Sequence, residues 1–274
     1  MTTSAFTEPA KKHLGQNFLH EKGVIDKIVQ AVDPRPGDRI VEIGPGQGAL
    51  TFPMLRRHGE LTAIEFDRDL HAPLQAAARE HGRLRLIEGD VLGVDFTALA
   101  ADIAPADGVL GKSIIRLVGN LPYNLSSPIL FHALDHAAAI RDMHFMLQKE
   151  VVERMAAGPG SKVFGRLSVM LQAYCAVIPL FTVPPGAFRP APKVDSAVVR
   201  LVPKPADKVE VVDHRMFANV VRAAFGQRRK TLRNALNGVA DSAAIEAAGL
   251  RPEARAEQVE VDGFVRLANL LASG

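Results

Sequence analysis

The residues with the clearest chemical meaning directly follow an apolar segment near the middle of the chain. Residues 114–118 are predicted to form a buried strand, and they lead into Asn120, Leu121, Pro122 and Tyr123. Pro122 has no N–H for a sheet and favours extended backbone in the residue before it, so the chain leaves the sheet here. An amide, a stiff backbone and an aromatic ring are then exposed together, which suits the gripping of a flat, nitrogen-rich group. The alternative is a strand-ending turn with a half-buried tyrosine, because turns commonly contain Asn and Pro.

Three acidic residues stand at the ends of three successive predicted strands. Glu42 lies within a glycine-rich turn that includes Gly44 and Gly46, and glycines let the backbone approach a ligand there. Glu65 ends the second strand, where a carboxylate could accept hydrogen bonds from two ribose hydroxyls. Asp90 ends the third strand, where it could accept a hydrogen bond from an adenine amino group. Three carboxylates suit the cationic sulfonium of S-adenosylmethionine better than a pyrophosphate.

The glycine-rich turn by itself also fits the looser fingerprint of a dinucleotide site, because Ala49 follows it. An NAD-dependent oxidoreductase is therefore a competing hypothesis. For each acid, the competing interpretation is a helix cap or a solvated side chain. Glu42 favours S-adenosylmethionine, because its carboxylate would stand where a dinucleotide site holds a pyrophosphate.

The elements that must position these residues alternate between strand and helix. Apolar runs predict strands at residues 39–43, 61–66, 84–90, 114–118, 143–148, 174–183 and 197–202. Helices are predicted at residues 24–32, 49–57, 68–80, 149–155 and 166–173, and one more helix is predicted to begin at residue 126. This order is typical of an α/β fold with a Rossmann-like, mostly parallel sheet, and the last two strands close that sheet as a hairpin.

The C-terminal part of the chain is predicted to form a small all-helical domain. Residues 203–207 read as a linker, which gives a first domain at residues 1–205 and a second at residues 206–274. Five cations gather within a short stretch of the second domain: Arg222, Arg228, Arg229, Lys230 and Arg233. A run of charge is usually a solvated face, but this density in a chain of net charge +3 favours contact with a phosphate backbone.

A proline-rich loop separates the last two predicted strands. Four prolines stiffen residues 183–196, and Phe188 and Lys193 are expected to project from this loop. A rigid loop with one aromatic ring and nearby cations is suited to stacking on a base. The competing interpretation places Phe188 in the core, as a plug beneath a stiff connection. A second loop at residues 156–163 is rich in Gly and Pro and is a candidate mobile lid.

The composition of the chain excludes several classes of protein. With 274 residues and 47% hydrophobic content it can bury a sizeable core, and no apolar run is long enough to span a membrane. The N-terminus lacks the pattern of a signal peptide. The single cysteine, Cys175, excludes an internal disulfide and suits a reducing cytosol. His132 and His136 have the spacing of a metal pair, but no third ligand is evident, so no metal is expected.

Together these motifs resemble those of the bacterial small-subunit ribosomal RNA adenine N6-dimethyltransferases. The matching segments are residues 15–19, 42–48, 65, 89–90, 120–123, 188–196 and 225–230. An apolar residue in the second position of segment 120–123 is typical of the ribosomal type of this amino-methylating motif. The resemblance covers nearly the whole chain without a departure at the core motifs, and the tail after residue 237 carries little family signal.

The resemblance implies a fold, a cofactor and a substrate. The fold would be a class I methyltransferase domain with a seven-stranded, mostly parallel sheet and a small C-terminal all-helical domain. The S-adenosylmethionine site would be lined by Asn17, Leu19, Gly44, Glu65, Asp90 and Asn120. The substrate would be two adjacent adenosines near the 3′ end of small-subunit rRNA in an assembling 30S particle, and each would receive two methyl groups. We expect a cytoplasmic, monomeric enzyme.

The predicted mechanism centres on the amide of Asn120. Its side-chain oxygen and the carbonyl of Leu121, held by Pro122, would accept the two N6 hydrogens of the target adenine. Tyr123 and Phe188 would stack on the base. Two other hypotheses remain open beside the oxidoreductase: a dimethyltransferase of large-subunit rRNA, and a non-catalytic RNA-binding assembly or transcription factor on the same scaffold.

Overall fold

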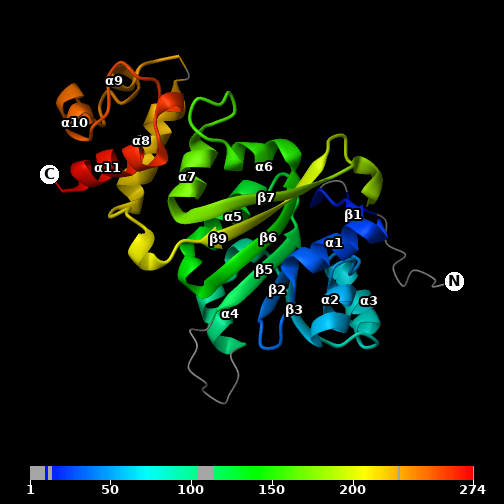
Figure 1. Cartoon of the computed structure of the whole chain (residues 1–274). Helices are drawn as coiled ribbons and strands as arrows, with labels where there is room; N and C mark the ends of the chain where they lie inside the picture. The colour runs from blue at the N-terminus through cyan, green and yellow to red at the C-terminus, as the bar shows by residue number, and fades with distance from the viewer. Residues whose placement is uncertain (1–9, 12–13, 104–113, 228, 274) are drawn as a thin grey trace. The chain divides into compact units, whose positions relative to one another are not determined.

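The structure, a computed structural model, describes residues 10–11, 14–103, 114–227 and 229–273 but not the side chain of Ala206. The chain divides into two compact units (Figure 1). The first comprises Met1–Lys149 and Pro179–Pro203, and the second comprises Glu150–Ile178 and Lys204–Gly274. The sequence alone predicts a single boundary near residue 205. The structure differs because residues 150–178 pack with the C-terminal helices.

The first unit carries most of a sheet whose seven strands follow the order β4-β3-β2-β5-β6-β9-β7. The strands are β2 (Ile40–Ile43), β3 (Glu60–Glu65), β4 (Arg83–Glu88), β5 (Ile115–Asn120), β6 (Ile140–Gln148), β7 (Cys175–Val183) and β9 (Ser196–Pro203). Neighbouring strands from β4 to β6 are parallel, whereas β9 is antiparallel to β6. The predicted seven-stranded, mostly parallel sheet is therefore confirmed.

The strand order reverses between β2 and β5, with β3 and β4 on one side and β6 on the other. Ligands of open α/β sheets bind at the carboxyl ends of the strands at such a reversal. All of β2 is buried, and so is β5 up to Gly119, as expected of strands covered on both faces. Gly119 allows the two strands to approach, because a Cβ there would lie 2.6 Å from the carbonyl oxygen of Ile43.

Helices follow the strands of the first unit (Figure 1). They are α1 (Lys22–Val32), α2 (Thr51–His58), α3 (His71–Ala78), α4 (Phe96–Asp102) and α5 (Ser126–Asp135). α1 begins after Glu21, whose carboxylate caps the first N–H groups of the helix, and its apolar face buries Ile28, Val29 and Val32. A separate two-stranded ribbon pairs β1 (Phe18–Leu19) with β8 (Phe188–Arg189), so the N-terminal segment is tied to the proline-rich loop.

Buried ion pairs join the amino ends of the central strands. Arg116, near the start of β5, donates hydrogen bonds to both carboxylate oxygens of Asp142 on β6, at 2.8 and 3.0 Å. It donates another to Asp38 at 2.7 Å. All three residues are buried, and Asp38 and Asp142 also pair with Arg141 and Arg200, so the network offsets the cost of burying its charges. No local sequence pattern predicts this network, because Arg116 lies inside a segment that otherwise reads as apolar.

The second unit is helical apart from the first residues of β7. Its helices are α6 (Lys149–Ala156), α7 (Arg166–Tyr174), α8 (His214–Gly226), α9 (Leu232–Ala235), α10 (Ser242–Ala247) and α11 (Val261–Ala272). α8 and α11 pack against each other and both contact α7. Phe217, Val221, Phe264 and Leu267 form the centre of their buried surface. Among the residues that the structure describes, no helix combines the length and the apolar character needed to cross a membrane.

Candidate active site

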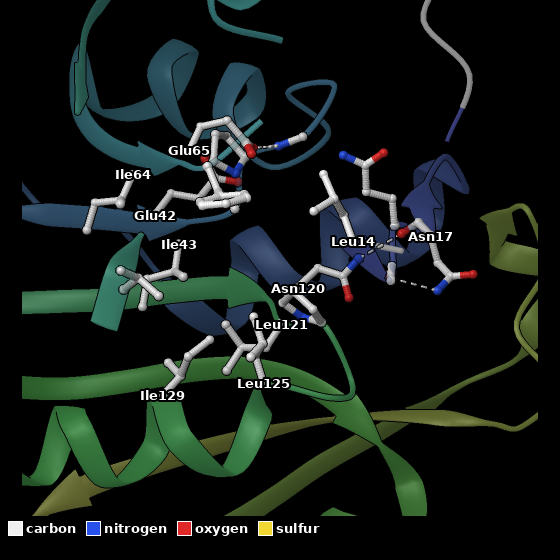
Figure 2. Close-up of a pocket in the computed structure, with 18 of the residues that line it drawn as sticks. Leu14, Asn17, Glu42, Ile43, Ile64, Glu65, Asn120, Leu121, Leu125 and Ile129 are labelled. Atoms are coloured by element: carbon white, nitrogen blue, oxygen red, sulfur yellow. Dashed lines mark hydrogen bonds between the residues drawn. The ribbon is translucent and has the colours of Figure 1, made fainter. Parts of the chain in front are cut away.

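A pocket of about 220 Å³ lies at the carboxyl ends of the central strands, where the strand order reverses. It is lined by residues 14–19, 42–47, 49–50, 64–66, 89–91, 120–125 and 129, all of which belong to the first unit. Figure 2 shows Glu42 and Glu65 on one side of the pocket, and Asn17 with Asn120 on the other. The structure thus brings together every predicted cofactor residue and the whole segment 120–123.

The glycine-rich turn after β2 presents backbone to the pocket. Gly44 and Gly46 have φ values of 66° and 55°, which are left-handed and favour glycine. A Cβ on Gly46 would also lie 3.2 Å from the ring of Phe18. The N–H of Gly46 donates a hydrogen bond to Oε2 of Glu65 at 3.0 Å. The turn and the acid therefore hold each other in place.

Glu42 is only 1% exposed, and Oγ1 of Thr51 donates a hydrogen bond to its Oε2 at 2.6 Å. Burial raises the pKa of the Glu42 carboxyl to about 8; the charge of Glu65 adds to this effect and the Thr51 hydrogen bond opposes it. The sequence suggests a carboxylate at this position, but a group with this pKa is mostly protonated at neutral pH. A positive charge nearby would lower the pKa and bring back the ionised form.

Glu65 and Asp90 differ in their surroundings. Glu65 is buried, which raises its pKa, although its carboxylate accepts hydrogen bonds from the N–H groups of Asp67 and Gly46 at 2.8 and 3.0 Å. Asp90 is exposed and accepts a hydrogen bond from the N–H of Leu92 at 3.0 Å. Asp90 therefore caps a short 3-10 helix and also lines the pocket.

Asn120 and Leu121 present oxygen acceptors on consecutive residues. Nδ2 of Asn120 donates a hydrogen bond to the main-chain carbonyl of Asn17 at 3.0 Å, which fixes the orientation of the amide. No described group donates to Oδ1 of Asn120. The N–H of Leu121 is bound to the carbonyl of Met146 at 3.1 Å, but within the described chain no donor reaches the carbonyl of Leu121 itself. The arrangement can thus accept two hydrogen bonds from one ligand.

Tyr123 is half-buried, and its hydroxyl forms a hydrogen bond with Oγ of Ser196 at 2.8 Å. Ser196 is fully buried at the start of β9. Burial raises the pKa of the Tyr123 hydroxyl. The ring is therefore held from its polar end at the pocket wall, while Pro122 is half-buried beside it.

Lys11 and residues 14–19, the described part of the N-terminal segment, bind to the body of the first unit. Nζ of Lys11 forms ion pairs with Asp67 and Asp69, and these hydrogen-bonded pairs raise the pKa of Lys11. Nε2 of Gln16 donates to Asp67 at 2.7 Å. Because the N–H of Asp67 in turn contacts Glu65, this segment connects the acidic side of the pocket to Asn17 on the opposite side.

The structure contradicts the prediction that Phe188 stacks on the target base. Its side chain is only 2% exposed and packs in the hydrophobic core with Leu19 and Val183. It is paired with Leu19 across the short ribbon. The ring is therefore unavailable to stack on a base, and the alternative interpretation, a plug beneath the proline-rich loop, is the one that fits the structure. Lys193 on the same loop is exposed.

The predicted RNA-binding cations of the second unit are exposed where the structure describes them. Arg222 on α8 donates a hydrogen bond to Asn219, and Arg233 forms an ion pair with Glu253. Arg229 and Lys230 lie between α8 and α9. Arg228 lies outside the described residues. Among the described members of this group, Arg233 is the one whose charge is partly neutralised by an ion pair.

Phe66 is a pocket residue that the sequence analysis missed. It follows Glu65 directly, lines the pocket and is 60% exposed, which is unusual for a phenylalanine. Its place after an acid at a strand end is a signal that could have identified it. An exposed aromatic ring beside a carboxylate provides an apolar face for a flat ligand.

The remaining candidates from the sequence do not join the pocket. The rings of His132 and His136 lie 5.1 Å apart in an edge-to-face arrangement, and His132 also contacts the carbonyl of Val94. The described part of the chain contains no cluster of three His, Cys, Asp or Glu side chains placed to hold a metal. Cys175 is buried, which raises the pKa of its thiol to about 12 and makes it a poor nucleophile.

The comparisons with known proteins agree with this geometry. The family model for "Ribosomal RNA adenine dimethylase" matches residues 7–273. "Ribosomal RNA small subunit methyltransferase A" from Xanthomonas campestris pv. campestris (strain B100) is 70% identical over 267 residues, covering 97% of this chain and 98% of the relative. The protein of the same name from Xanthomonas oryzae pv. oryzae (strain PXO99A) is 69% identical with the same coverage.

Two solved structures share the fold. A dimethyladenosine transferase from Plasmodium falciparum has a TM-score of 0.76 and 25% identity, covering 91% of this chain and 95% of that one. The 23S rRNA methyltransferase ErmE has a TM-score of 0.68 and 24% identity, covering 93% and 100%. The fold and the pocket define an S-adenosylmethionine-dependent methyltransferase. The chain belongs to the ribosomal RNA adenine dimethylase family, and it is an enzyme that methylates rRNA.

Proposed function

We propose that this enzyme transfers two methyl groups to N6 of each of two adjacent adenosines near the 3′ end of small-subunit rRNA. The family supports adenine dimethylation, and the relatives named for the small subunit support 16S rRNA as the substrate. The rRNA would be presented in an assembling 30S particle in the cytoplasm, to an enzyme that acts as a monomer. The particle and the two adenosines are inferred from the resemblance of residues 120–123 and 188–196 to the motifs of the family.

The pocket residues fit S-adenosylmethionine. No described lining residue carries a positive charge, so none opposes a cationic ligand. Glu65 would bind the ribose hydroxyls, Asp90 the adenine amino group and Phe66 the adenine face. The rest of the cofactor would be held by Asn17, Leu19, Glu42, Gly44, Gly46 and Asn120. When bound, the cofactor supplies an electrophilic methyl group on its sulfonium.

The observation that carries the proposal is the pair of open acceptors on Asn120 and Leu121. The N6 amine of adenine is a poor nucleophile, because its lone pair is delocalised into the ring. Hydrogen bonds from both N6 hydrogens to these two oxygens favour a more pyramidal nitrogen, whose lone pair is then free to attack. Since Nδ2 of Asn120 is bound to Asn17, the amide presents an acceptor rather than a donor. Orientation of the two reactants then supplies most of the rate acceleration.

Tyr123 would stack on the target adenine, and such stacking contributes about 1–3 kcal/mol per base. Its hydrogen bond to Ser196 holds the ring in place before the base arrives. The target base must be unpaired or flipped to reach it. After the first transfer only one N6 hydrogen remains, so the pocket must then accept a methyl group beside Asn120 or Leu121.

The RNA outside the pocket would be bound by cations of the two units. We propose Lys193, Arg222, Arg228, Arg229, Lys230 and Arg233 for this role. Such contacts position the RNA through its phosphates and weaken as the salt concentration rises. Arg233 is expected to contribute least, because Glu253 already pairs with it.

The test is methyl transfer to isolated small and large ribosomal subunits, with the dimethyladenosine identified by mass spectrometry. The wild type is expected to methylate the small subunit, and Asn120→Ala to lose transfer by about 100-fold or more while binding S-adenosylmethionine in calorimetry. Leu121→Met is the matched control, because it keeps the backbone carbonyl and nearly the same volume. Near-normal dimethylation by Asn120→Ala would refute the mechanism. Methylation confined to large subunits would refute the substrate.

A further inference from the structure

The second unit contains a cavity that methyl transfer does not use. Its volume is about 740 Å³, within the range of about 300–1,000 Å³ that is typical of sites for small ligands. It is formed by α6, the segment 160–166, the end of α8 with residues 227, 229 and 230, and residues 255–257. All of these residues belong to the second unit.

Positive charge dominates the wall of this cavity. Two carboxylates, Glu150 and Glu257, face six cations: Arg154, Lys162, Arg166, Arg229, Lys230 and Arg255. Glu150 is already paired with Arg154. Among the described residues, no carboxylate forms an ion pair with Arg166, Arg229, Lys230 or Arg255. Exposed, unmatched cations that converge on one opening favour an anionic ligand.

The same cavity also has an apolar surface. Val163 is 41% exposed, although it is a large hydrophobic residue. Phe164 and Phe225 meet edge to face with ring centroids 6.0 Å apart, and Phe225 also packs on Phe264 at 5.5 Å. These rings are fixed by their neighbours, so they offer a rigid apolar surface beside the cations. A phosphate joined to a flat base matches both halves of this lining.

We infer that this cavity binds one unpaired nucleotide of the RNA substrate. Arg166 and Arg255, with Arg229 and Lys230, bind its phosphate, and its base packs against the surface formed by Val163 and Phe225. The inference rests on the proposed function for the identity of the RNA. The second unit therefore selects an unpaired nucleotide. A duplex contacts only the cations, because its bases stay stacked and cannot enter the cavity.

The test compares two variants that lose the same charge. Arg166→Gln with Arg255→Gln removes two cations from the cavity, whereas Lys208→Gln with Arg251→Gln removes two exposed cations that do not line it. The probes are a fluorescein-labelled single-stranded RNA of about twelve nucleotides and a duplex of the same length. Binding is measured by fluorescence anisotropy over a range of salt concentrations.

The cavity variant is expected to bind the single strand at least 10-fold more weakly, with a smaller loss for the duplex. The slope of log affinity against log salt should fall by about 0.7, because the cavity binds one phosphate and each phosphate contact on a single strand contributes about 0.7. The control variant should stay within about 3-fold of the wild type. Val163→Glu, at an exposed position, should weaken single-strand binding without removing a cation.

Equal losses in the two double variants, or equal losses for single strand and duplex, would overturn the inference. Methyl transfer to small subunits is measured in parallel, where the cavity variant should raise KM and leave kcat unchanged. If the wild-type protein transfers no methyl group, the proposed function is refuted. The anisotropy measurements would still show whether the cavity binds single-stranded RNA.

Discussion

Replacing Glu42 by Gln should raise the stability of the enzyme near pH 8 and lower its affinity for the cofactor. The carboxyl group is 1% exposed and has a pKa of about 8, against an ordinary value of 4.5. The folded state therefore holds a proton that the unfolded chain releases between these two pH values. Wild-type stability must fall as pH rises through this window and level off above pH 8.

The size of the effect follows from the pKa. Each pH unit well below the pKa costs about 1.4 kcal/mol and the loss flattens as the pH approaches 8, so ionisation of Glu42 lowers the free energy of unfolding by about 2 kcal/mol between pH 6 and pH 8. The glutamine has no charge to lose, and its carbonyl can still accept the hydrogen bond from Thr51. The variant should therefore gain about 2 kcal/mol relative to the wild type over this interval.

Urea unfolding at pH 6, 7 and 8 measures this difference. Glu80→Gln is the matched control, since it removes an exposed carboxylate of the same unit and should leave the pH dependence unchanged. If the curves of Glu42→Gln and the wild type stay parallel across the three pH values, the carboxyl does not titrate near pH 8. The explanation given for its environment is then wrong.

The same substitution, which raises stability, should lower the affinity for S-adenosylmethionine. A sulfonium near Glu42 lowers the pKa of the carboxyl, so binding at pH 7 should release a proton from the wild type but not from the variant. Calorimetry in two buffers of different ionisation enthalpy detects this release. Affinity for S-adenosylmethionine should rise with pH up to about 8. Affinity for the product S-adenosylhomocysteine, which lacks the sulfonium charge, should not change, and an equal pH dependence for both ligands would contradict the reasoning.

Three further predictions concern the pocket wall. Phe66→Ala should weaken S-adenosylmethionine binding about 10-fold, because it removes an aromatic contact worth about 1–2 kcal/mol. Since the side chain is 60% exposed, the melting temperature should not change, and an unaltered dissociation constant in calorimetry would exclude the contact. Gly46→Ala should lower stability in urea unfolding by about 1–2 kcal/mol, because φ is 55° and the new Cβ meets Phe18; full stability would show that the turn relaxes freely. Tyr123→Phe should keep kcat within about 10-fold, because the ring remains, whereas Tyr123→Ala should lose stacking of about 1–3 kcal/mol. Equal kinetics for these two variants would argue against stacking.

The strands and the cofactor pocket could be predicted because their signals are local. The segments that form β2 and β5 are almost continuous apolar runs, as expected of parallel strands covered on both faces. Each acid or amide of the pocket directly follows such a run, and the carboxyl ends of parallel strands meet at one edge of a sheet. The order of residues along the chain was therefore enough to group Glu65, Asp90 and Asn120.

The sequence was less informative where residues far apart in the chain meet. Phe188 stands in a loop by its local pattern, but its ring fills a space beside Leu19, which is contributed from the other end of the unit. Arg116 appears as an exception in an apolar run until Asp38 and Asp142 are seen on both sides of it. The protonated state of Glu42 likewise depends on burial that no local pattern reveals.

The second unit is discontinuous, and this has a consequence for how the protein is made. During synthesis α7 emerges well before α8 and α11, which it contacts in the folded unit. These contacts form only after the last helix has left the ribosome, so the unit can close only at the end of translation. A chain shortened at residue 205 would keep α7 but lose both of these helices. Such a truncation would produce an aggregation-prone protein and not an isolated, folded catalytic domain.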